Sequence, residues 1–183
     1  MSTIVLRGLD KDKLCRWIKT AEDNGTGDPV YSFIAAWIGF NYYYSTFAFA
    51  EDKKDEGFKI WSNSNFHGSK GDKAQWSFLI QHSSFESFFN NFKKQNKKIF
   101  GVSIKLPIVD MLKGEFVPKD RTGEIKLEEL STLEIFEILY QIRNNLFHGD
   151  KDPKKNERDL ELSTFACRFA LPFLRNLNTN TFL

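Results

Sequence analysis

The segment from Pro29 to Ala50 constrains the fold of this chain more than any other. It contains no charged residue and is dense in Phe, Tyr, Ala and Ile. A helix that is apolar on all sides must be covered on all sides, either by lipid or by other helices. Asn41, Thr46 and three consecutive tyrosines argue against lipid, and no second segment of this kind follows. We therefore expect the central helix of a soluble bundle, with a single membrane span as the alternative.

Apolar residues at helical spacing predict further helices around this one. They occur in residues 8–23, in residues 73–95 with a break at 82–84, and in residues 158–177, where Pro172 predicts a kink or an early end of the helix. Asp28 is suited to cap the central helix, with Pro29 at its first position. Residues 51–73 lack a sustained period and are expected to be a long connection with room for a short helix. A chain of 183 residues is long enough for one domain, so we predict a single all-α helical bundle over residues 1–183.

Residues 99–127 interrupt the helical pattern and predict a small extended or hairpin insertion. Val102, Ile104 and Leu106 alternate with polar residues, and Pro107 then ends the extended segment. Residues 108–112 are expected to form one helical turn. Residues 114–127 are compatible with a hairpin or with an irregular loop, and the sequence leaves both open.

Composition limits the classes of function. The formal net charge of +2 is too small to argue for nucleic-acid binding from the overall field. Cys15 and Cys167 have no metal or redox spacing and are expected to be buried thiols in a reducing compartment, which points to the cytoplasm. His67 and His82 lack partners at ligand spacing, so neither a metal nor another cofactor is expected.

Residues 131–149 are predicted to form one helix with its polar residues near the C-terminal end. Ser131 and Glu134 form a capping box, and Gly149 is suited to the C′ position. The apolar surface of this helix is wide, which implies burial against several neighbours. Four polar side chains interrupt it: Arg143, Asn144, Asn145 and His148. Buried polar groups need partners or serve a task.

The spacing alone favours a structural role for these residues. Arg143 could form a salt bridge with Glu137 or Asp159, and His148 could cap the helix carbonyls. A step of five residues turns about 140° along a helix, so Arg143 and His148 do not stack. They reach a common point if the last turn loosens, or if a second chain presents the same pair across a two-fold axis. Asn41 is either a satisfied core amide or a wall of the same cleft.

The pattern Arg143-Asn144-x-x-x-His148 resembles the Arg-polar-x-x-x-His motif of the HEPN superfamily. The longer run from Tyr140 to Lys151 is similar to a widespread bacterial form of that motif. Arg158-Asp159 and the run from Trp37 to Asn41 add looser similarities. The specific part of the resemblance covers about twenty residues, at the C-terminal end of the predicted helix.

The resemblance implies an all-α domain that forms a homodimer by pairing the helix 131–149 with its symmetry copy. Many members are metal-independent endoribonucleases, often toxins or phage-defence effectors, and an antitoxin or a neighbouring defence protein is then an expected partner. Other members only bind a nucleotide, RNA or a partner protein. If the roles of the motif residues in that family apply to this chain, Arg143 and His148 are catalytic and Asn144 is a supporting polar residue. The candidate RNA- or nucleotide-binding residues are Asn145, Lys151, Lys154, Lys155, Arg158 and Asn41.

The chemistry of these side chains agrees with RNA cleavage. Histidine titrates near neutral pH and can transfer protons to and from the reacting oxygens. Arginine offers a planar set of donors that can bind two phosphate oxygens at once. Attack by the 2′-hydroxyl would leave a 2′,3′-cyclic phosphate and a 5′-hydroxyl.

Overall fold

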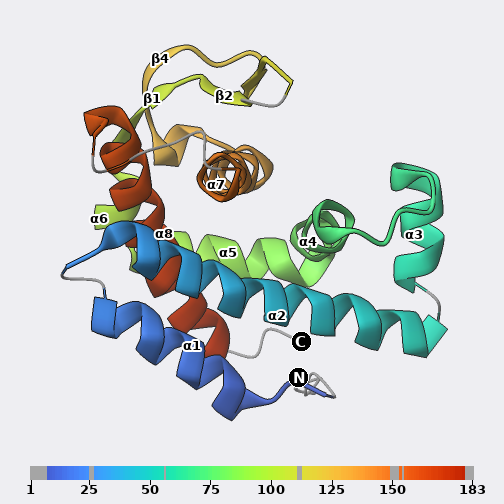
Figure 1. Ribbon diagram of the computed structural model, residues 1–183. Coiled ribbons are helices and arrows are strands. Elements are labelled where there is room, and N and C mark those ends of the chain that lie inside the picture. The colour runs from blue at the N-terminus through green and yellow to red at the C-terminus, as the bar shows by residue number, and fades with distance from the viewer. Residues whose placement is uncertain are drawn as a thin grey trace.

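The computed structural model describes residues 8–24, 27–55, 57–110, 113–148, 153 and 155–179, without the side chains of 52–55. The fold is mostly helical (Figure 1). The long helix α2 (Pro29–Asp55) crosses the molecule, and α1 (Lys11–Asn24) and α8 (Glu157–Thr179) pack against it. The expectation of a central helix in a bundle is confirmed. Among the described residues, no helix combines the length and the apolar character that a membrane crossing requires.

The ends of the helices follow the local sequence signals. The carboxylate of Asp28 accepts hydrogen bonds from the amides of Val30 and Tyr31, both at 3.0 Å, and Pro29 opens α2. The predicted break at residues 82–84 is also confirmed. His82 is extended between α4 (Asp72–Gln81) and α5 (Ser83–Gln95), and its ring accepts from the amide of Ser84. Pro172 lies inside α8, which continues past it to Thr179.

The connection predicted over residues 51–73 is shorter than expected, although the short helix that the prediction allowed is present. Helix α2 continues to Asp55, and α3 (Gly57–Phe66) follows. Phe58 and Trp61 of α3 both contact the ring of Phe78 on α4, with centroids 5.3 and 5.4 Å apart. The helix is stabilised by this packing across the chain, which a search for local periodicity does not detect.

Residues 103–110 and 115–126 pair with each other as the two arms of a hairpin, which two prolines divide into two short sheets. Strand β1 (Ser103–Leu106) pairs antiparallel with β4 (Gly123–Lys126), and β2 (Ile108–Asp110) pairs with β3 (Glu115–Val117). Pro107 and Pro118 lie between the two pairs. The predicted helical turn at 108–112 was wrong, because the β-branched residues Ile108 and Val109 belong to β2. Residues 111 and 112 lie outside the described residues.

Phenylalanine rings from five helices form the centre of the core. They come from α2, α5, α6 (Lys97–Phe100), α7 (Thr132–Phe147) and α8 and meet mostly edge to face, which suits aromatic pairs. The rings are Phe40, Phe85, Phe89, Phe92, Phe100, Phe136, Phe169 and Phe173. Inward-facing residues of β1 and β2 join the same apolar cluster, so the hairpin is part of the bundle rather than an appendage.

Only one of the two cysteines is buried as expected. Cys167 lies inside the core, and its Sγ is 3.1 Å from Ser32 Oγ. Cys15 is exposed, which corrects the prediction. The reason is its position on α1, where Leu14 and Ile18 point inward and Cys15 lies beside that stripe. Both thiols are free.

Gly39 marks the closest approach of α2 to its neighbours. A Cβ atom at this position would lie 2.6 Å from Leu174 Cδ2 and 3.1 Å from Trp17 Cβ. We expect Gly39→Ala to lower the free energy of unfolding by about 1–3 kcal/mol, because three packed helices would have to separate. Urea denaturation measures this value. Gly27→Ala is the control, since nothing lies within 4 Å of a Cβ there; equal stability of the two variants would contradict the packing argument.

Candidate functional site

Helix α7 positions the candidate catalytic residues. It begins as predicted, with the Ser131 amide donating to Glu134 Oε2 at 2.8 Å and the Glu134 amide donating to Ser131 Oγ at 3.3 Å. Its inward face is buried through Ile135, Phe136, Ile138, Leu139, Gln141, Ile142 and Asn145. His148 is the C-cap residue, and its amide donates to Asn144 O at 3.0 Å. Gly149 lies outside the described residues.

Asn145 holds α7 against the hairpin. Its side chain is 3% exposed, and Nδ2 donates to the carbonyl oxygen of Val109 at 2.8 Å. Its Oδ1 accepts from Gln141 Nε2, also at 2.8 Å. This corrects the prediction that Asn145 contacts RNA or a nucleotide. Both ends of its amide are engaged within the protein, as buried polar groups require.

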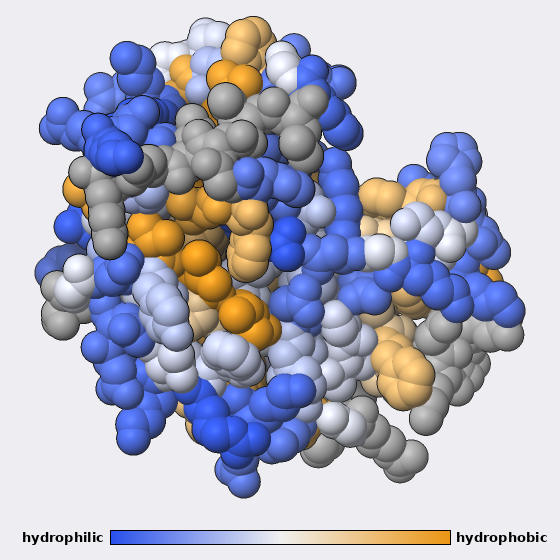
Figure 2. All heavy atoms as spheres, in the orientation of Figure 1, coloured by the Kyte–Doolittle hydropathy of each residue, from blue (hydrophilic) through white to orange (hydrophobic). Residues whose placement is uncertain are grey.

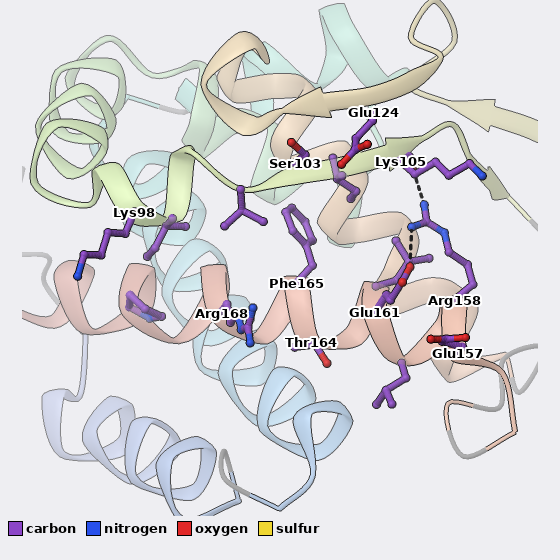
Figure 3. A pocket seen from close by; sticks show the side chains of 16 residues that line it. Lys98, Ser103, Lys105, Glu124, Glu157, Arg158, Glu161, Thr164, Phe165 and Arg168 are labelled. Atoms are coloured by element: carbon purple, nitrogen blue, oxygen red, sulfur yellow. Dashed lines mark hydrogen bonds and ion pairs between the residues drawn. The ribbon is translucent and has the colours of Figure 1, made fainter.

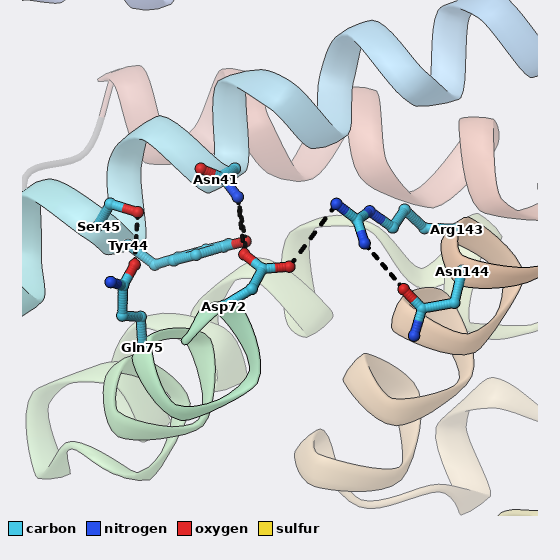
Figure 4. Close-up of polar contacts among 7 residues, drawn as sticks. All are labelled: Asn41, Tyr44, Ser45, Asp72, Gln75, Arg143 and Asn144. Carbon is cyan, nitrogen blue, oxygen red and sulfur yellow. Dashed lines mark hydrogen bonds and ion pairs between the residues drawn. The ribbon is translucent and has the colours of Figure 1, made fainter. Parts of the chain in front are cut away.

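Arg143 connects α7 to α4 and α2 through Asp72 (Figure 4). Arg143 Nη1 donates to Asn144 Oδ1 at 2.8 Å, and Nη2 lies 3.8 Å from Asp72 Oδ2. The other oxygen of Asp72 accepts from Asn41 Nδ2 at 2.7 Å and from the hydroxyl of Tyr44. The expected salt bridge with Glu137 or Asp159 was wrong, since the partner is Asp72. The amide nitrogen of Asn41 is therefore bonded within the protein, and Asn41 is part of the network behind Arg143.

The guanidinium of Arg143 is also held by aromatic faces. Its Cζ lies 4.6 Å from the ring centroid of Phe147 and 5.9 Å from that of Tyr140. Within the described part of the chain, the buried atoms Arg143 Nε and Asp72 Oδ2 have no hydrogen-bond partner. A separation of 3.8 Å is too long for a hydrogen bond. An anion that displaced Asp72 could therefore gain donors that the resting protein does not fully use.

A pocket of about 680 Å³ brings Arg143, Asn144 and His148 together. It lies between α7, α4 and the hairpin. Its lining is balanced in charge, because the cations face five carboxylates. The cations are Lys73, Lys113, Lys119 and Arg143, and the carboxylates are those of Asp110, Glu115, Asp120, Glu134 and Glu137. One copy of the chain therefore does not present a strongly basic cleft.

Burial controls the protonation of the groups around the pocket. Burial first, and then the neighbouring Asp72 carboxylate, raise the pKa of Tyr44 well above its usual range. Burial also raises the pKa of Tyr140, and a hydrogen bond with Asn144 opposes this change. Both phenols thus stay protonated at neutral pH. Burial raises the pKa of Glu137, whereas the hydrogen bond from Arg121 Nε at 2.8 Å lowers the pKa of Glu134.

The remaining candidate binding residues do not meet at this pocket. Arg158 points the other way, where it donates to the carbonyl of Lys105 and pairs with Glu161 at 3.4 Å. This corrects its assignment to the cleft, since it lines a different pocket. Lys155 is exposed just before α8, and Lys151 and Lys154 lie outside the described residues. Among the described residues, no cluster of His, Cys, Asp or Glu could hold a metal ion.

Asp72 and Tyr44 are site residues that sequence reasoning did not identify, whereas Glu137 was named as a possible partner of Arg143. Asp72 follows Gly71 at the start of α4, far from Arg143 in the chain, and no local pattern links the two. The absence of charge in residues 29–50 was the only available signal for Tyr44. A polar partner for Arg143 was expected, but only the packing of α4 beside α7 decides which carboxylate forms the ion pair with Arg143.

The described structure therefore defines a mostly helical protein with a hairpin insertion and a pocket at the C-terminal end of α7. Comparison of the chain with protein-family models, with curated proteins and with solved structures finds no match.

Proposed function

We propose that this chain is a HEPN-type domain that cleaves RNA without a metal ion. The observation that carries the proposal is that Arg143, Asn144 and His148, which form the motif, line one pocket. His148 is exposed at the end of α7, where its side chain can reach a ligand bound in the pocket. The mostly helical fold is compatible with the HEPN-like up-and-down bundle that the motif suggests.

The chemistry divides between three side chains. Arg143 binds the scissile phosphate and stabilises the charge that develops on its oxygens. Asn144, which already accepts from Arg143 Nη1 at 2.8 Å, orients the guanidinium. His148 removes the proton from the 2′-hydroxyl or protonates the leaving 5′-oxygen. The products are a 2′,3′-cyclic phosphate and a 5′-hydroxyl, so no water molecule is consumed in the cleavage step.

Two copies of the chain would supply both an acid and a base. We propose a homodimer that pairs α7 with its symmetry copy, as the motif implies. Leu133 and Phe147 of α7 are exposed at opposite ends of the helix. In the orientation of Figure 1, Figure 2 shows an apolar area beside the end of α7, over α2 and α8. This area supports an interface there. A role as a cytoplasmic toxin or phage-defence effector, with an antitoxin or neighbouring defence protein as partner, is part of the same proposal.

Cleavage of a labelled RNA in the presence of excess EDTA tests the proposal. We expect cleavage to persist and the 5′ fragment to end in a cyclic phosphate, which acid treatment opens and phosphatase alone does not remove. His148→Ala should lose the activity. A protein that leaves single-stranded and structured RNA intact, or a variant as active as the parent, would contradict the proposal.

The balanced lining of the pocket favours a second candidate function. Five carboxylates and the Asp72–Arg143 pair reduce the positive potential that RNA binding needs. A non-catalytic HEPN module that binds a nucleotide, RNA or a partner protein is the alternative. In that case His148→Ala changes the binding affinity, and the parent protein shows no cleavage to lose.

Replacing Asp72 measures how strongly this carboxylate restrains Arg143. Asp72→Asn keeps an oxygen that can accept from Asn41 and Tyr44 but removes the charge facing Arg143. We expect the affinity for a short RNA to rise by up to about fivefold, since partly exposed ion pairs contribute about 1 kcal/mol or less. Fluorescence anisotropy measures it. Asp120→Asn makes the same charge change on an exposed residue of the same pocket. If both variants raise the affinity equally, the cause is the overall charge of the pocket and not the release of Arg143 from Asp72.

A further inference from the structure

A second pocket, of about 880 Å³, lies between β1 and α8 (Figure 3). It shares no lining residue with the pocket at the end of α7. In Figure 3 the strand β1 runs along one side and the helix α8 along the other, with Phe165 pointing from the helix into the space between them. The proposed RNA chemistry does not use this groove, which therefore needs a separate explanation.

One edge of β1 is open toward this groove. Among the strands that the structure describes, β1 pairs only with β4, and the Leu127 amide donates to the carbonyl of Val102 at 3.1 Å. In this antiparallel register the main chains of Ile104 and Leu106 also face β4, so those of Ser103 and Lys105 face the other way. Arg158 of α8 donates to the Lys105 carbonyl, which confirms the direction. The Ser103 amide and carbonyl and the Lys105 amide have no partner within the described residues.

The walls of the groove combine apolar surface with charges that are separated along it. Leu160, Phe165 and Val102 supply apolar area, and the first and last of these are exposed. Lys98 and Arg168 lie toward the start of β1 (Figure 3). Three carboxylates, those of Glu124, Glu157 and Glu161, lie toward its end beside two cations, Lys105 and Arg158, and Arg158 pairs with Glu161 at 3.4 Å, so negative charge is in excess there. Among the described residues neither Lys98 nor Arg168 forms an ion pair.

We propose that this groove binds an extended peptide that adds to the open edge of β1 as an antiparallel strand. Main-chain hydrogen bonds to Ser103 and Lys105 would provide affinity, and the helix α8 would contact alternate side chains, which is the known mode of strand addition beside a helix. Antiparallel pairing is slightly more stable per residue than parallel pairing. It places the C-terminal end of the peptide at Lys98 and Arg168, and its N-terminal end at the three glutamates. The partner therefore has a β-branched centre, a basic N-terminal side and an acidic C-terminal side.

The first experiment measures binding of a defined peptide to the full chain. The probe is KVTVTE with an amino-terminal fluorophore on a flexible linker, and the readout is fluorescence anisotropy. We expect saturable binding, and at least about tenfold weaker binding of the peptide EVTVTK, in which the two terminal charges are exchanged. Methylation of the peptide nitrogens that face β1 should remove binding. Equal binding of the two charge arrangements, or of the methylated peptide, would overturn the proposal, and so would the absence of binding up to millimolar concentration.

Two variants test the site itself. Ser103→Pro removes a donor that the β1–β4 pairing does not use, so the fold should survive, while the proline ring blocks the edge. We expect it to lose peptide binding and to keep its parent activity on RNA. Lys98→Glu/Arg168→Glu should bind KVTVTE at least tenfold more weakly and should instead prefer KVTVTK. Lys94→Glu, which changes an exposed lysine outside the groove, is the charge control and should bind like the parent.

The second variant keeps the proposal testable if Ser103→Pro does not fold. Unchanged preference for KVTVTE in the double charge variant would overturn it. The proposal would also be overturned if the peptide fails to bind and Ser103→Pro dissociates a dimer. In that case the open edge of β1 pairs with a second copy of this chain. Peptide binding does not depend on cleavage of RNA, so the failure of one proposal leaves the other to be judged by its own assay.

Discussion

We expect His148→Ala to lower the rate of RNA cleavage by about 10²–10⁴-fold, the contribution that a positioned general acid or base makes to such reactions. The imidazole is exposed in the same pocket as Arg143 and Asn144. Its removal should barely affect the fold, because the helix end is closed by the main-chain bond from the His148 amide to Asn144 O at 3.0 Å. Single-turnover cleavage in EDTA, with enzyme in excess, measures the chemical step.

The control removes a different imidazole. His67 lies in the turn after α3 in a left-handed conformation, with φ of 50°, which asparagine tolerates better than most residues. His67→Asn should therefore fold and cleave RNA like the parent. Because all the proteins are purified in the same way, activity that disappears only in His148→Ala also excludes a contaminating nuclease. A loss of less than about tenfold would show that His148 does not transfer a proton in the reaction.

Phe136→Ala should produce the largest loss of stability of any substitution described above. The ring is 1% exposed and has ring contacts with Phe40, Phe173 and Phe169, at 5.4, 5.3 and 6.1 Å between centroids. It therefore joins α7 to α2 and α8, and further contacts reach α5. We expect the free energy of unfolding to fall by about 3–5 kcal/mol, from transfer of the ring and from the cavity that remains. That is a large part of the 5–15 kcal/mol of an ordinary domain.

Guanidinium denaturation followed by far-UV circular dichroism measures this loss. Phe116→Ala is the matched control, because that ring is 54% exposed and should change stability by about 0.5 kcal/mol or less. If Phe136→Ala is too unstable to purify, Phe136→Leu should show a smaller loss of the same sign, since it leaves a smaller cavity. A loss under about 1 kcal/mol for Phe136→Ala would mean that the rings do not form one close-packed core.

Local sequence signals were sufficient for the helices whose ends they mark. Asp28 and Pro29 predicted the start of α2, and Ser131 and Glu134 predicted the capping box of α7, because each signal depends on neighbours a few residues away. The break near His82 has the same local origin. The uncharged segment 29–50 determined that one helix would be surrounded by others, since a helix that is apolar on every side must be covered. The motif also identified the end of α7 as the place to look for a site.

The tertiary structure decided what those residues contact. Helix α3 is stabilised because Phe58 and Trp61 pack against Phe78. Ile108 belongs to a strand because it pairs with Val117 on the neighbouring strand. Sequence alone determined that Arg143 and His148 come at the end of a buried helix. The packing of α4 beside α7 places Asp72 next to Arg143. Contacts with the hairpin keep Asn145 in the interior, through the carbonyl of Val109, and hold Arg158 at the second groove, through the carbonyl of Lys105. Contacts between residues far apart in the chain depend on three-dimensional packing, which no short pattern of residues encodes.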